Sequence, residues 1–361
     1  MRILAIETSC DDTCIAVVEF QGLEIKILGN VISSQVKIHA KYGGVYPSLA
    51  KREHQKNLPM VLRKALRTAR NPKIDLIAVT VGPGLEPCLW VGVNFAKDLA
   101  KKLKLPLIPV NHIEAHIFAN WLTPIDSNSK LFPAICLVVS GGHTQLILMR
   151  NFGKYKILGE TRDDAAGECF DKAARILGLS YPGGPIVAKM AVKFKMQNVK
   201  CKIKLPRPMI YQKNYDFSFS GLKTAVLYLV KQLTIGNKQL TMKQVREICA
   251  EVQQAIIDVL VHKTLKAAKE YRAKAIILGG GVTANEELRK QIKRRTRKEI
   301  PNVKCLIPDA KFCTDNAVMT AVTGYFNRRE KKKPEKGDED KSSSSPFANA
   351  RVIEADANLR L

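Results

Sequence analysis

The same succession of expected strands and turns occurs twice along this chain of 361 residues. In the first half, the apolar runs at residues 2–6, 14–20 and 25–33 follow one another with no helical pattern between them. Strands joined by short polar turns pair as an antiparallel meander. A helix is expected at about residues 49–70, and a buried strand follows at residues 74–81. A meander followed by helix and strand is therefore the first structural unit that the sequence predicts.

The second half repeats this order. Apolar runs at residues 134–139, 145–150 and 154–161 predict another meander, and residues 275–278 predict a late buried strand. A helical insert, at about residues 185–262, lies between them. Strand, polar turn, strand, strand and helix, with a later strand and helix, is the order of a ribonuclease-H-like unit. The sequence thus predicts an α/β protein with duplicated ribonuclease-H-like domains.

The expected boundaries follow from this duplication. We expect an N-terminal domain over residues 1–130, a C-terminal domain over residues 131–326 and a tail over residues 327–361. The tail is rich in charge and then in serine, and it has few apolar residues, so it is predicted to be disordered.

The segment NHIEAH at residues 111–116 is the strongest local motif. If Asn111 caps a helix, His112 and His116 lie one turn apart on one face, where both imidazoles can bind one metal ion. Glu114 then points away from that face. A zinc protease with the H-E-x-x-H motif needs a glutamate directly after the first histidine, and an isoleucine stands there. The motif indicates a metal site without a protease base; two histidines that only pack or hydrogen-bond are the alternative.

Charge is the clearest compositional signal. Lysine and arginine number 59 against 33 acidic residues, which gives a net charge of +26. Cations concentrate at residues 193–204, 289–298 and 328–333. Such an excess predicts a polyanionic partner. Nucleic acid is favoured over a membrane surface, because no cluster is paired with a large apolar face.

Localisation and redox state follow from the apolar runs and the cysteines. No run approaches the roughly 18 to 20 apolar residues of a membrane span, and the apolar start is too short for a signal peptide. The 9 cysteines are odd in number and never spaced C-x-x-C. We therefore expect a cytoplasmic protein with reduced thiols and no disulfide framework.

Three turns between expected elements can expose backbone N–H groups to a phosphate. They are TSCD at residues 8–11, SGGH at 140–143 and LGGGVTAN at 278–285, the last of which opens a helix. Ligands bind at the carboxyl ends of strands in such folds. The three turns at matched positions predict a nucleotide in the cleft between the domains, although tight turns also need glycine for steric reasons alone.

Several single residues near these turns can act on a ligand. Asp171 can accept hydrogen bonds from a ligand hydroxyl or form a solvated pair with Lys172. Gly184, in a rigid turn, can allow close approach of the backbone. Asp315 is the best candidate for a carboxylate metal ligand, or it is an ordinary acid at a helix N-terminus.

A set of segments in fixed order resembles the TsaD family, the catalytic subunits of tRNA N6-adenosine threonylcarbamoyltransferase, once labelled O-sialoglycoprotein endopeptidase or glycoprotease. The resemblance runs from the first residue to about Tyr325. It rests on IETSCDDT at 6–13, the histidine motif at 111–116, VSGGHT at 139–144, GE and FDK within 167–172, YPGGP at 181–185, residues 217–223 and GGGVTAN at 279–285.

The resemblance implies an actin-, Hsp70- and sugar-kinase-like (ASKHA) fold with a nucleotide cleft between its domains. It implies transfer of the threonylcarbamoyl group from threonylcarbamoyl-AMP to the N6 amine of adenosine 37, 3′ of the anticodon, in tRNAs that read codons beginning with adenine. AMP is released. A phosphotransferase or ATPase of the same fold is the alternative function, and a secreted metalloprotease is disfavoured by the missing base and signal peptide.

The resemblance also assigns residues and partners. It implies one divalent metal per subunit, iron with zinc as the alternative, on His112, His116 and Asp315. The residues implied to hold the adenylate are Val139, Ser140, Gly141, Gly142, His143, Asp171, Gly184 and Asn285. We add Asp11 as a catalytic candidate that orients the substrate or accepts a proton. The implied partners are tRNA, a TsaB-like paralogue and a TsaE-like ATPase, with no membrane.

Overall fold

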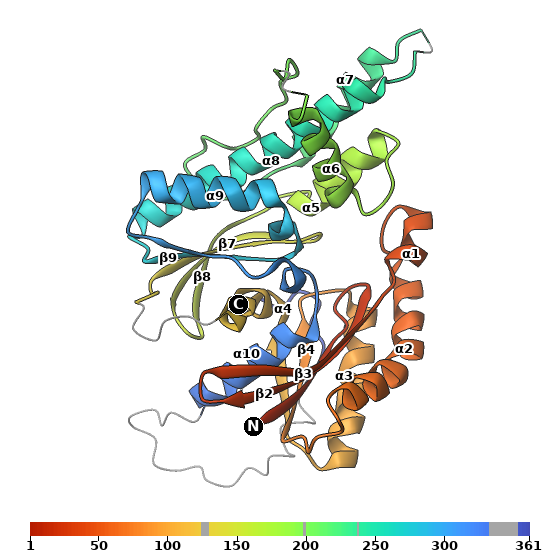
Figure 1. Ribbon diagram of the computed structural model, residues 1–361, viewed down its shortest axis with the longest axis vertical. Helices are drawn as coiled ribbons and strands as arrows, with labels where there is room; N and C mark the ends of the chain where they lie inside the picture. The colour runs from red at the N-terminus through yellow and green to blue at the C-terminus, as the bar shows by residue number, and fades with distance from the viewer. Residues whose placement is uncertain (124–129, 198–199, 237, 332–352) are drawn as a thin grey trace. The chain divides into compact units, whose positions relative to one another are not determined.

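The structure is a computed structural model that describes residues 1–123, 130–197, 200–236, 238–331 and 353–361 (Figure 1). Two compact units share the chain. The first is Met1–Asp126 together with Asp315–Leu361, and the second is Ser127–Thr314. The second unit is therefore inserted into the sequence of the first.

This division differs from the expected boundaries at the second crossing. The chain returns to the first unit at Asp315, whereas we expected the second domain to continue to residue 326. The reason is the last helix, α10 (Ala317–Lys331), which packs against strands of the first sheet through buried residues such as Val318 and Val322.

The first sheet has five strands in the order β3-β2-β1-β4-β5. β1, β2 and β3 pair in antiparallel fashion, and β4 and β5 continue the sheet in parallel with β1. The expected meander and late strand are therefore confirmed. The strands are β1 (Arg2–Glu7), β2 (Asp12–Gln21), β3 (Glu24–Ser34), β4 (Leu76–Gly82) and β5 (Leu107–Asn111).

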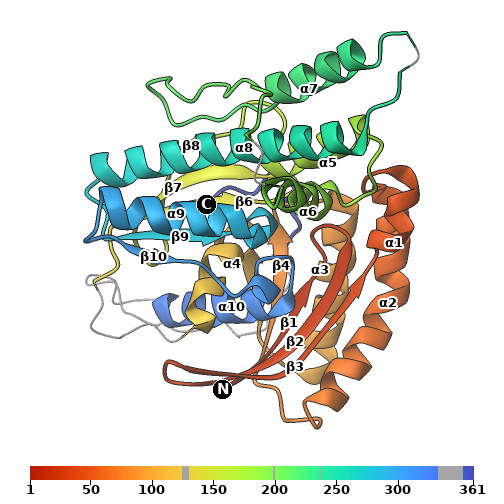
Figure 2. The same ribbon diagram turned by 45° about the horizontal axis from the view of Figure 1, so that its top comes forward.

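Helices cover both faces of this sheet, which explains why β1 and β4 are almost wholly apolar and buried. α2 (Pro47–Thr68) and α3 (Glu86–Leu103) cover one face, and α4 (His112–Phe118) and α10 cover the other (Figures 1 and 2). The shorter helices of this unit are α1 (Val36–His39), η1 (Ala40–Tyr42) and η2 (Ala119–Leu122).

The second sheet has five strands in the order β10-β9-β6-β7-β8. β6, β7 and β8 form the meander, and β9 and β10 extend it in parallel with β6. Counted from the meander edge, this is the strand order of the first sheet, so the duplication is confirmed. The strands are β6 (Ala134–Val139), β7 (Thr144–Asn151), β8 (Lys154–Glu160), β9 (Ala275–Gly279) and β10 (Lys304–Leu306).

One large core joins this sheet to its helices. Alternate residues of β6, Ile135, Leu137 and Val139, pack with buried residues of α5, α8 and α9. The 29-residue α8 is the longest helix described, and it continues past the expected end of the insert. The helices are α5 (Ala166–Ile176), α6 (Gly183–Lys195), α7 (Ser220–Leu233), α8 (Met242–Glu270), η3 (Gly281–Ala284), α9 (Glu286–Glu299) and η4 (Ala310–Phe312).

Within the part of the chain that the structure describes, no helix is both long enough and apolar enough to span a bilayer.

The C-terminal segment, residues 353–361, packs on the first unit. Ile353 is 6% exposed and joins the core beneath α3. The Asp356 N–H donates to Val81 O at 2.8 Å, and the Gly84 N–H donates to Ala357 O at 3.3 Å. The prediction of disorder over residues 327–361 is therefore wrong at both ends of that range, because α10 continues to Lys331 and residues 353–361 are packed. Residues 332–352 lie outside the described residues.

Candidate active site

The histidine motif begins a helix, as the sequence predicted. Asn111 is the N-cap of α4, because its Oδ1 accepts hydrogen bonds from the N–H groups of Ile113 at 2.8 Å and Glu114 at 3.1 Å. His112 and His116 then lie one turn apart, with ring centroids separated by 4.6 Å. All seven residues of α4 are buried. A buried helix that presents two imidazoles on one face needs partners for their nitrogen atoms.

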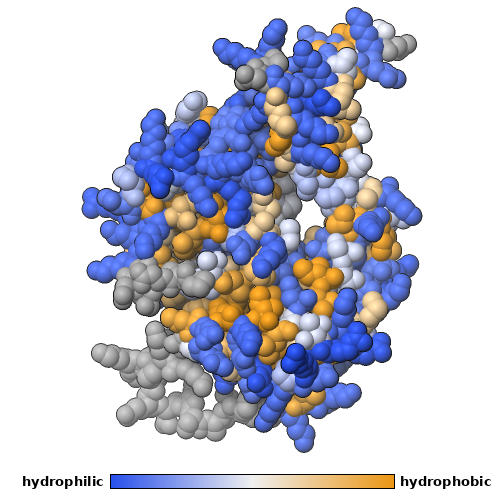
Figure 3. Space-filling view, in the orientation of Figure 1, coloured by the Kyte–Doolittle hydropathy of each residue, from blue (hydrophilic) through white to orange (hydrophobic). Residues whose placement is uncertain are grey.

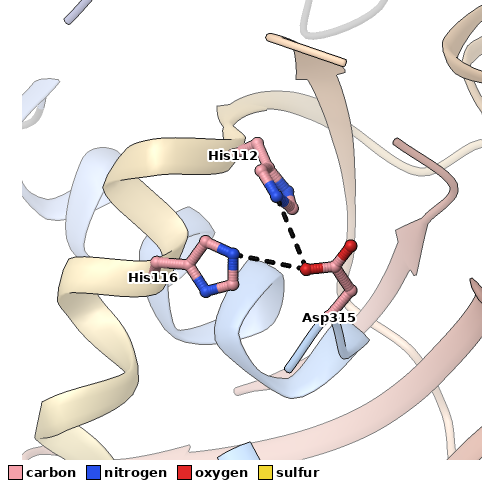
Figure 4. A group of neighbouring side chains, drawn as sticks. All are labelled: His112, His116 and Asp315. Atoms are coloured by element: carbon pink, nitrogen blue, oxygen red, sulfur yellow. Dashed lines mark ion pairs between the residues drawn. The ribbon is translucent and has the colours of Figure 1, made fainter. Parts of the chain in front are cut away.

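Asp315 supplies a carboxylate at this face (Figure 4). Its Oδ1 lies 3.3 Å from His116 Nε2 and 3.6 Å from His112 Nε2. The first turn of α10 is capped by the next residue, Asn316, whose Oδ1 accepts a hydrogen bond from the Met319 N–H at 3.0 Å. The cap is thus not Asp315, and the structure brings together the three residues proposed from the sequence.

These three residues fit one divalent ion. Their ligand atoms all lie within 4.8 Å of one another. Ligands that sit about 2.1 Å from a shared ion lie about 3.4 Å apart, close to the contacts of Asp315 with the two rings. In the described part of the chain, the buried His116 Nε2, the nitrogen nearest Asp315, has no hydrogen-bond partner, which is costly for a buried polar atom unless an ion binds it. Two imidazoles and a carboxylate suit iron or zinc better than magnesium.

The electrostatics of the two histidines differ. Burial lowers the pKa of His116, which favours the neutral imidazole that a metal needs. Burial also acts to lower the pKa of His112, but the carboxylates of Glu7 and Asp315 outweigh it and raise that pKa to about 9. Without an ion, His112 therefore carries the positive charge of this buried group.

Two carboxyl groups follow β1: Asp11 lies in the turn, and Asp12 is the first residue of β2. Burial raises the pKa of Asp11, and it raises the pKa of Asp12 to about 7. The carboxylate of Asp315 also acts to raise the pKa of Asp11, but Asp11 is not one of the three residues whose ligand atoms lie within 4.8 Å of one another. Asp11 thus lies in the turn beside β1 but outside the three-residue cluster.

The matching turn of the second unit is open. The Ser140 N–H donates to His143 O at 2.8 Å, and the His143 N–H donates to Ser140 Oγ at 3.1 Å, which closes the turn. Gly141 and Gly142 are exposed, and a Cβ added at either would meet no heavy atom within 4 Å. The turn therefore has room for a ligand at its backbone.

Two other glycines let neighbouring segments approach this turn. A Cβ on Gly280, whose φ is +89°, would lie 2.4 Å from Val139 O. A Cβ on Gly167, at the start of α5, would lie 2.5 Å from Ser140 O. The end of β6, the turn after β9 and the start of α5 thus meet at one place.

The remaining candidates have structural contacts of their own. Asp171 Oδ1 accepts a hydrogen bond from the Gly183 N–H at 2.7 Å, so Asp171, on α5, holds the start of α6. The next residue of α6 is Gly184. Lys172 contacts Asp164 at 2.7 Å and Glu168 at 2.8 Å.

Asn285 is the N-cap of α9. Its Oδ1 accepts the Leu288 N–H at 3.1 Å, and its Nδ2 donates to Gln253 Oε1 at 2.8 Å. Both ends of this side chain are therefore engaged within the second unit, and its position at the end of the glycine turn is fixed.

Comparison with known proteins identifies the family. The sequence profile of the TsaD family, tRNA N6-adenosine threonylcarbamoyltransferase, matches residues 26–322. Curated proteins of that name from Thermosipho africanus and Dehalococcoides mccartyi are 49% and 48% identical to this chain, over 90% of its length and 94% and 93% of theirs. The chain belongs to the TsaD family.

A solved structure agrees on the fold. T. kodakarensis HypF is similar with a TM-score of 0.55 at 13% sequence identity, over 91% of this chain and 48% of that one. Together with the two matching sheets, this likeness supports the duplicated architecture expected for the TsaD family.

One polar side chain beside the histidines of this TsaD-family site was not among the site residues predicted from the sequence. Glu7, fully buried at the end of β1, lies 3.1 Å from His112 Nδ1. Burial acts to raise the pKa of Glu7. The charge of His112 and its hydrogen bond act to lower it, and the resulting pKa is below the ordinary value of a glutamate. The signal in the sequence is a carboxylate at the end of the apolar run of residues 3–6, since a buried carboxylate is rarely left unpaired.

The cationic cluster at residues 289–298 forms an exposed face of α9, over which Figure 3 shows hydrophilic residues. The ion pair of Lys290 with Glu286 is long, at 3.7 Å. The exposed cations are Lys290, Lys293, Arg294, Arg297 and Lys298. This positive face is consistent with a polyanionic partner, as the charge predicted.

Proposed function

We propose that this chain transfers the threonylcarbamoyl group of threonylcarbamoyl-AMP to N6 of adenosine 37 in tRNAs that read codons beginning with adenine, with release of AMP. Membership of the TsaD family carries the reaction class. The observation that best supports it in the structure is the His112, His116 and Asp315 cluster, which gives an ASKHA-type fold a metal site built from imidazoles.

The chemistry explains why such a site is useful. The adenine amine is a poor nucleophile, because its lone pair is delocalised into the ring. The carbonyl that it attacks must be polarised, and the phosphate that leaves must be stabilised. A divalent ion on the three residues, iron with zinc as the alternative, would supply Lewis acidity for both needs.

The second unit would hold the adenylate. In this proposal, the segment Val139, Ser140, Gly141, Gly142 and His143 holds the phosphate through the backbone N–H groups of its two glycines. The N–H groups of Ser140 and His143 close the turn by hydrogen bonds within it, and the space beside the two glycines is open. Asp171 accepts a ligand hydroxyl, while Gly184 lets the backbone approach: an added Cβ there would find Phe170 Cβ at 3.9 Å. Asn285 fixes the turn at the start of α9.

Asp11 would act on the amine of the acceptor. Its burial raises its pKa, which makes its carboxylate a better base than a solvated aspartate. We propose that it orients the amine or accepts its proton. Kinetic parity of Asp11→Asn with the unaltered enzyme would exclude this role.

The proposed partners are tRNA, a TsaB-like paralogue and a TsaE-like ATPase, which act together in the cytoplasm. The exposed cations of α9 offer one face for the phosphate backbone of the RNA.

One assay tests the proposal. The purified chain and its bacterial partners are incubated with synthetic threonylcarbamoyl-AMP and unmodified tRNA, and the nucleosides of the tRNA are read by mass spectrometry. We expect threonylcarbamoyladenosine and a matching amount of AMP. Turnover of ATP to ADP with a phosphorylated small molecule, and no modified nucleoside, would support a phosphotransferase instead.

A further inference from the structure

We infer that Glu7 is the positioning residue of the metal centre: it holds His112 with a proton on Nδ1, so that Nε2 faces Asp315 and the ion. The inference deepens the proposed metal site and rests on it. Glu7 is neither a ligand nor a group that touches the substrate.

The geometry separates the two nitrogen atoms of His112. Its Nε2 lies 3.6 Å from Asp315 Oδ1, on the side shared with His116. Its Nδ1 lies 3.1 Å from Glu7 Oε2. When one nitrogen of a histidine binds a metal, a hydrogen bond from the other nitrogen to an acceptor fixes the orientation of the ring and its tautomer.

Glu7 is the acceptor that decides this protonation. Ser9 Oγ also lies close to Nδ1, at 3.2 Å, but a hydroxyl can donate or accept and therefore imposes no tautomer. An ionised carboxylate only accepts. With a fully buried Glu7 at hydrogen-bond distance, Nδ1 must carry the proton.

The carboxylate itself is held from several elements of the first unit. Its Oε1 accepts the Ser9 N–H at 2.6 Å, and its Oε2 accepts the Thr80 hydroxyl at 2.6 Å. The Thr80 hydroxyl also lies 3.2 Å from the Thr320 hydroxyl on α10. Donors from the turn after β1, from β4 and from α4 thus converge on two oxygen atoms.

This convergence makes glutamine a sharp probe. Glu7→Gln keeps the size of the side chain but replaces one acceptor oxygen by an NH₂ group, so at least one of the Ser9, Thr80 and His112 donors faces another donor. The ring of His112 then loses the partner that fixes its orientation, while His112, His116 and Asp315 all remain.

The matched control is Glu114→Gln. Glu114 is buried on α4, the helix that carries both histidines, and its Oε2 accepts a hydrogen bond from Asn327 Nδ2 at 3.0 Å. Glu114→Gln therefore reports the general cost of neutralising a buried carboxylate of the first unit by the same substitution. Thr80→Val is a second variant that leaves Glu7 in place and removes one of its donors.

The experiment uses the full chain, freed of metal, and Zn²⁺ as the probe in competition with a chelating dye. We expect Glu7→Gln to weaken Zn²⁺ binding by about ten- to a hundredfold, Thr80→Val by less, and Glu114→Gln by no more than about twofold. Equal affinities of Glu7→Gln and the unaltered chain would overturn the inference. If Glu7→Gln does not fold, an unchanged Zn²⁺ affinity of Thr80→Val would overturn the inference instead.

A second readout works without any ion. In metal-free protein we expect a protected, downfield proton resonance from Nδ1 of His112, identified by its loss in His112→Ala and displaced in Glu7→Gln. If the unaltered chain lacks this resonance, or if Glu7→Gln shows it at an unchanged chemical shift, the proposed role of Glu7 is wrong. Failure of the unaltered chain to bind Zn²⁺ would instead defeat the proposed metal site, and the resonance would still decide what Glu7 does.

Discussion

The two sheets share one strand order, yet the ends of their strands carry different chemistry. In the first unit, Glu7 ends β1 and His112 follows β5, and both side chains are buried and charged or polar. In the second unit, β6 leads into the exposed Gly141 and Gly142, and β9 leads into Gly280. The first set can hold a cation, and the second exposes backbone to an anion.

The difference teaches that topology fixes where a ligand binds and side chains fix which ligand it is. Both sites lie at the carboxyl ends of strands, where α/β folds bind ligands. A duplicated fold can therefore divide a reaction between its halves.

The largest effect is expected from His112→Ala combined with His116→Ala. Loss of a Lewis acid removes several kcal/mol of transition-state stabilisation, so transfer activity should fall by at least about 10²- to 10³-fold. Binding of an adenylate analogue, measured by calorimetry, should persist because the open turn is untouched. An equal loss of adenylate affinity would show that the two halves do not divide the chemistry.

Gly280→Val tests the glycine end. At φ +89° a side chain is strained, and its Cβ would lie 2.4 Å from Val139 O, so thermal or denaturant unfolding should show a loss of about 2–3 kcal/mol.

Gly141→Ala is the control for Gly280→Val, since a Cβ there meets nothing within 4 Å. Its stability should change by less than about 0.5 kcal/mol. Its affinity for the adenylate should nevertheless fall, because the added methyl group narrows the approach to the turn. Equal stabilities of the two variants would contradict the close approach seen at Gly280.

Deletion of residues 353–361 tests the packing of this segment on the first unit. Removal of the buried Ile353 and of the Asp356 hydrogen bond to Val81 should lower the free energy of unfolding by about 2 kcal/mol. Hydrogen exchange should show the loss around β4 and leave β6 and β9 protected. Glu354→Ala, an exposed change in the same segment, is the control; uniform loss of protection would argue against local docking.

The smallest effect is expected on the pH dependence of stability, through Asp12. The matching turn of the second unit, residues 140–143, has no carboxylate. The pKa of Asp12 rises from 3.8 to about 7 in the folded chain. Between these values the folded state binds more protons than the unfolded state, so metal-free protein should lose stability as pH rises from about 4 to 7.

Asp12→Asn should remove that loss and gain about 1–2 kcal/mol at pH 8, with no gain at pH 4. Denaturant unfolding of both proteins across this range measures it. Parallel pH profiles would mean that Asp12 is ionised in the fold.

The sequence predicted what depends on neighbouring residues. The two meanders follow from apolar runs and turns, and the cap at Asn111 places His112 and His116 on one face. Contacts between residues far apart in the chain could not be predicted from the sequence. The sequence allows either Asp315 or Asn316 to cap α10, and the structure shows that Asn316 does. Thr80 and Glu7 are likewise far apart in the chain, and the fold brings them together. The docking of Ile353 depends on a surface formed by residues far away in the sequence.

The insertion of the second unit has a mechanical consequence. Both chain ends lie in the first unit, so force applied to Met1 and Leu361 is carried by that unit alone. An ion shared by His116 and Asp315 would clamp the two places where the chain leaves and re-enters it. In a pulling experiment the second unit should bear no load until this clamp opens, and the first rupture force should fall when a chelator removes the ion.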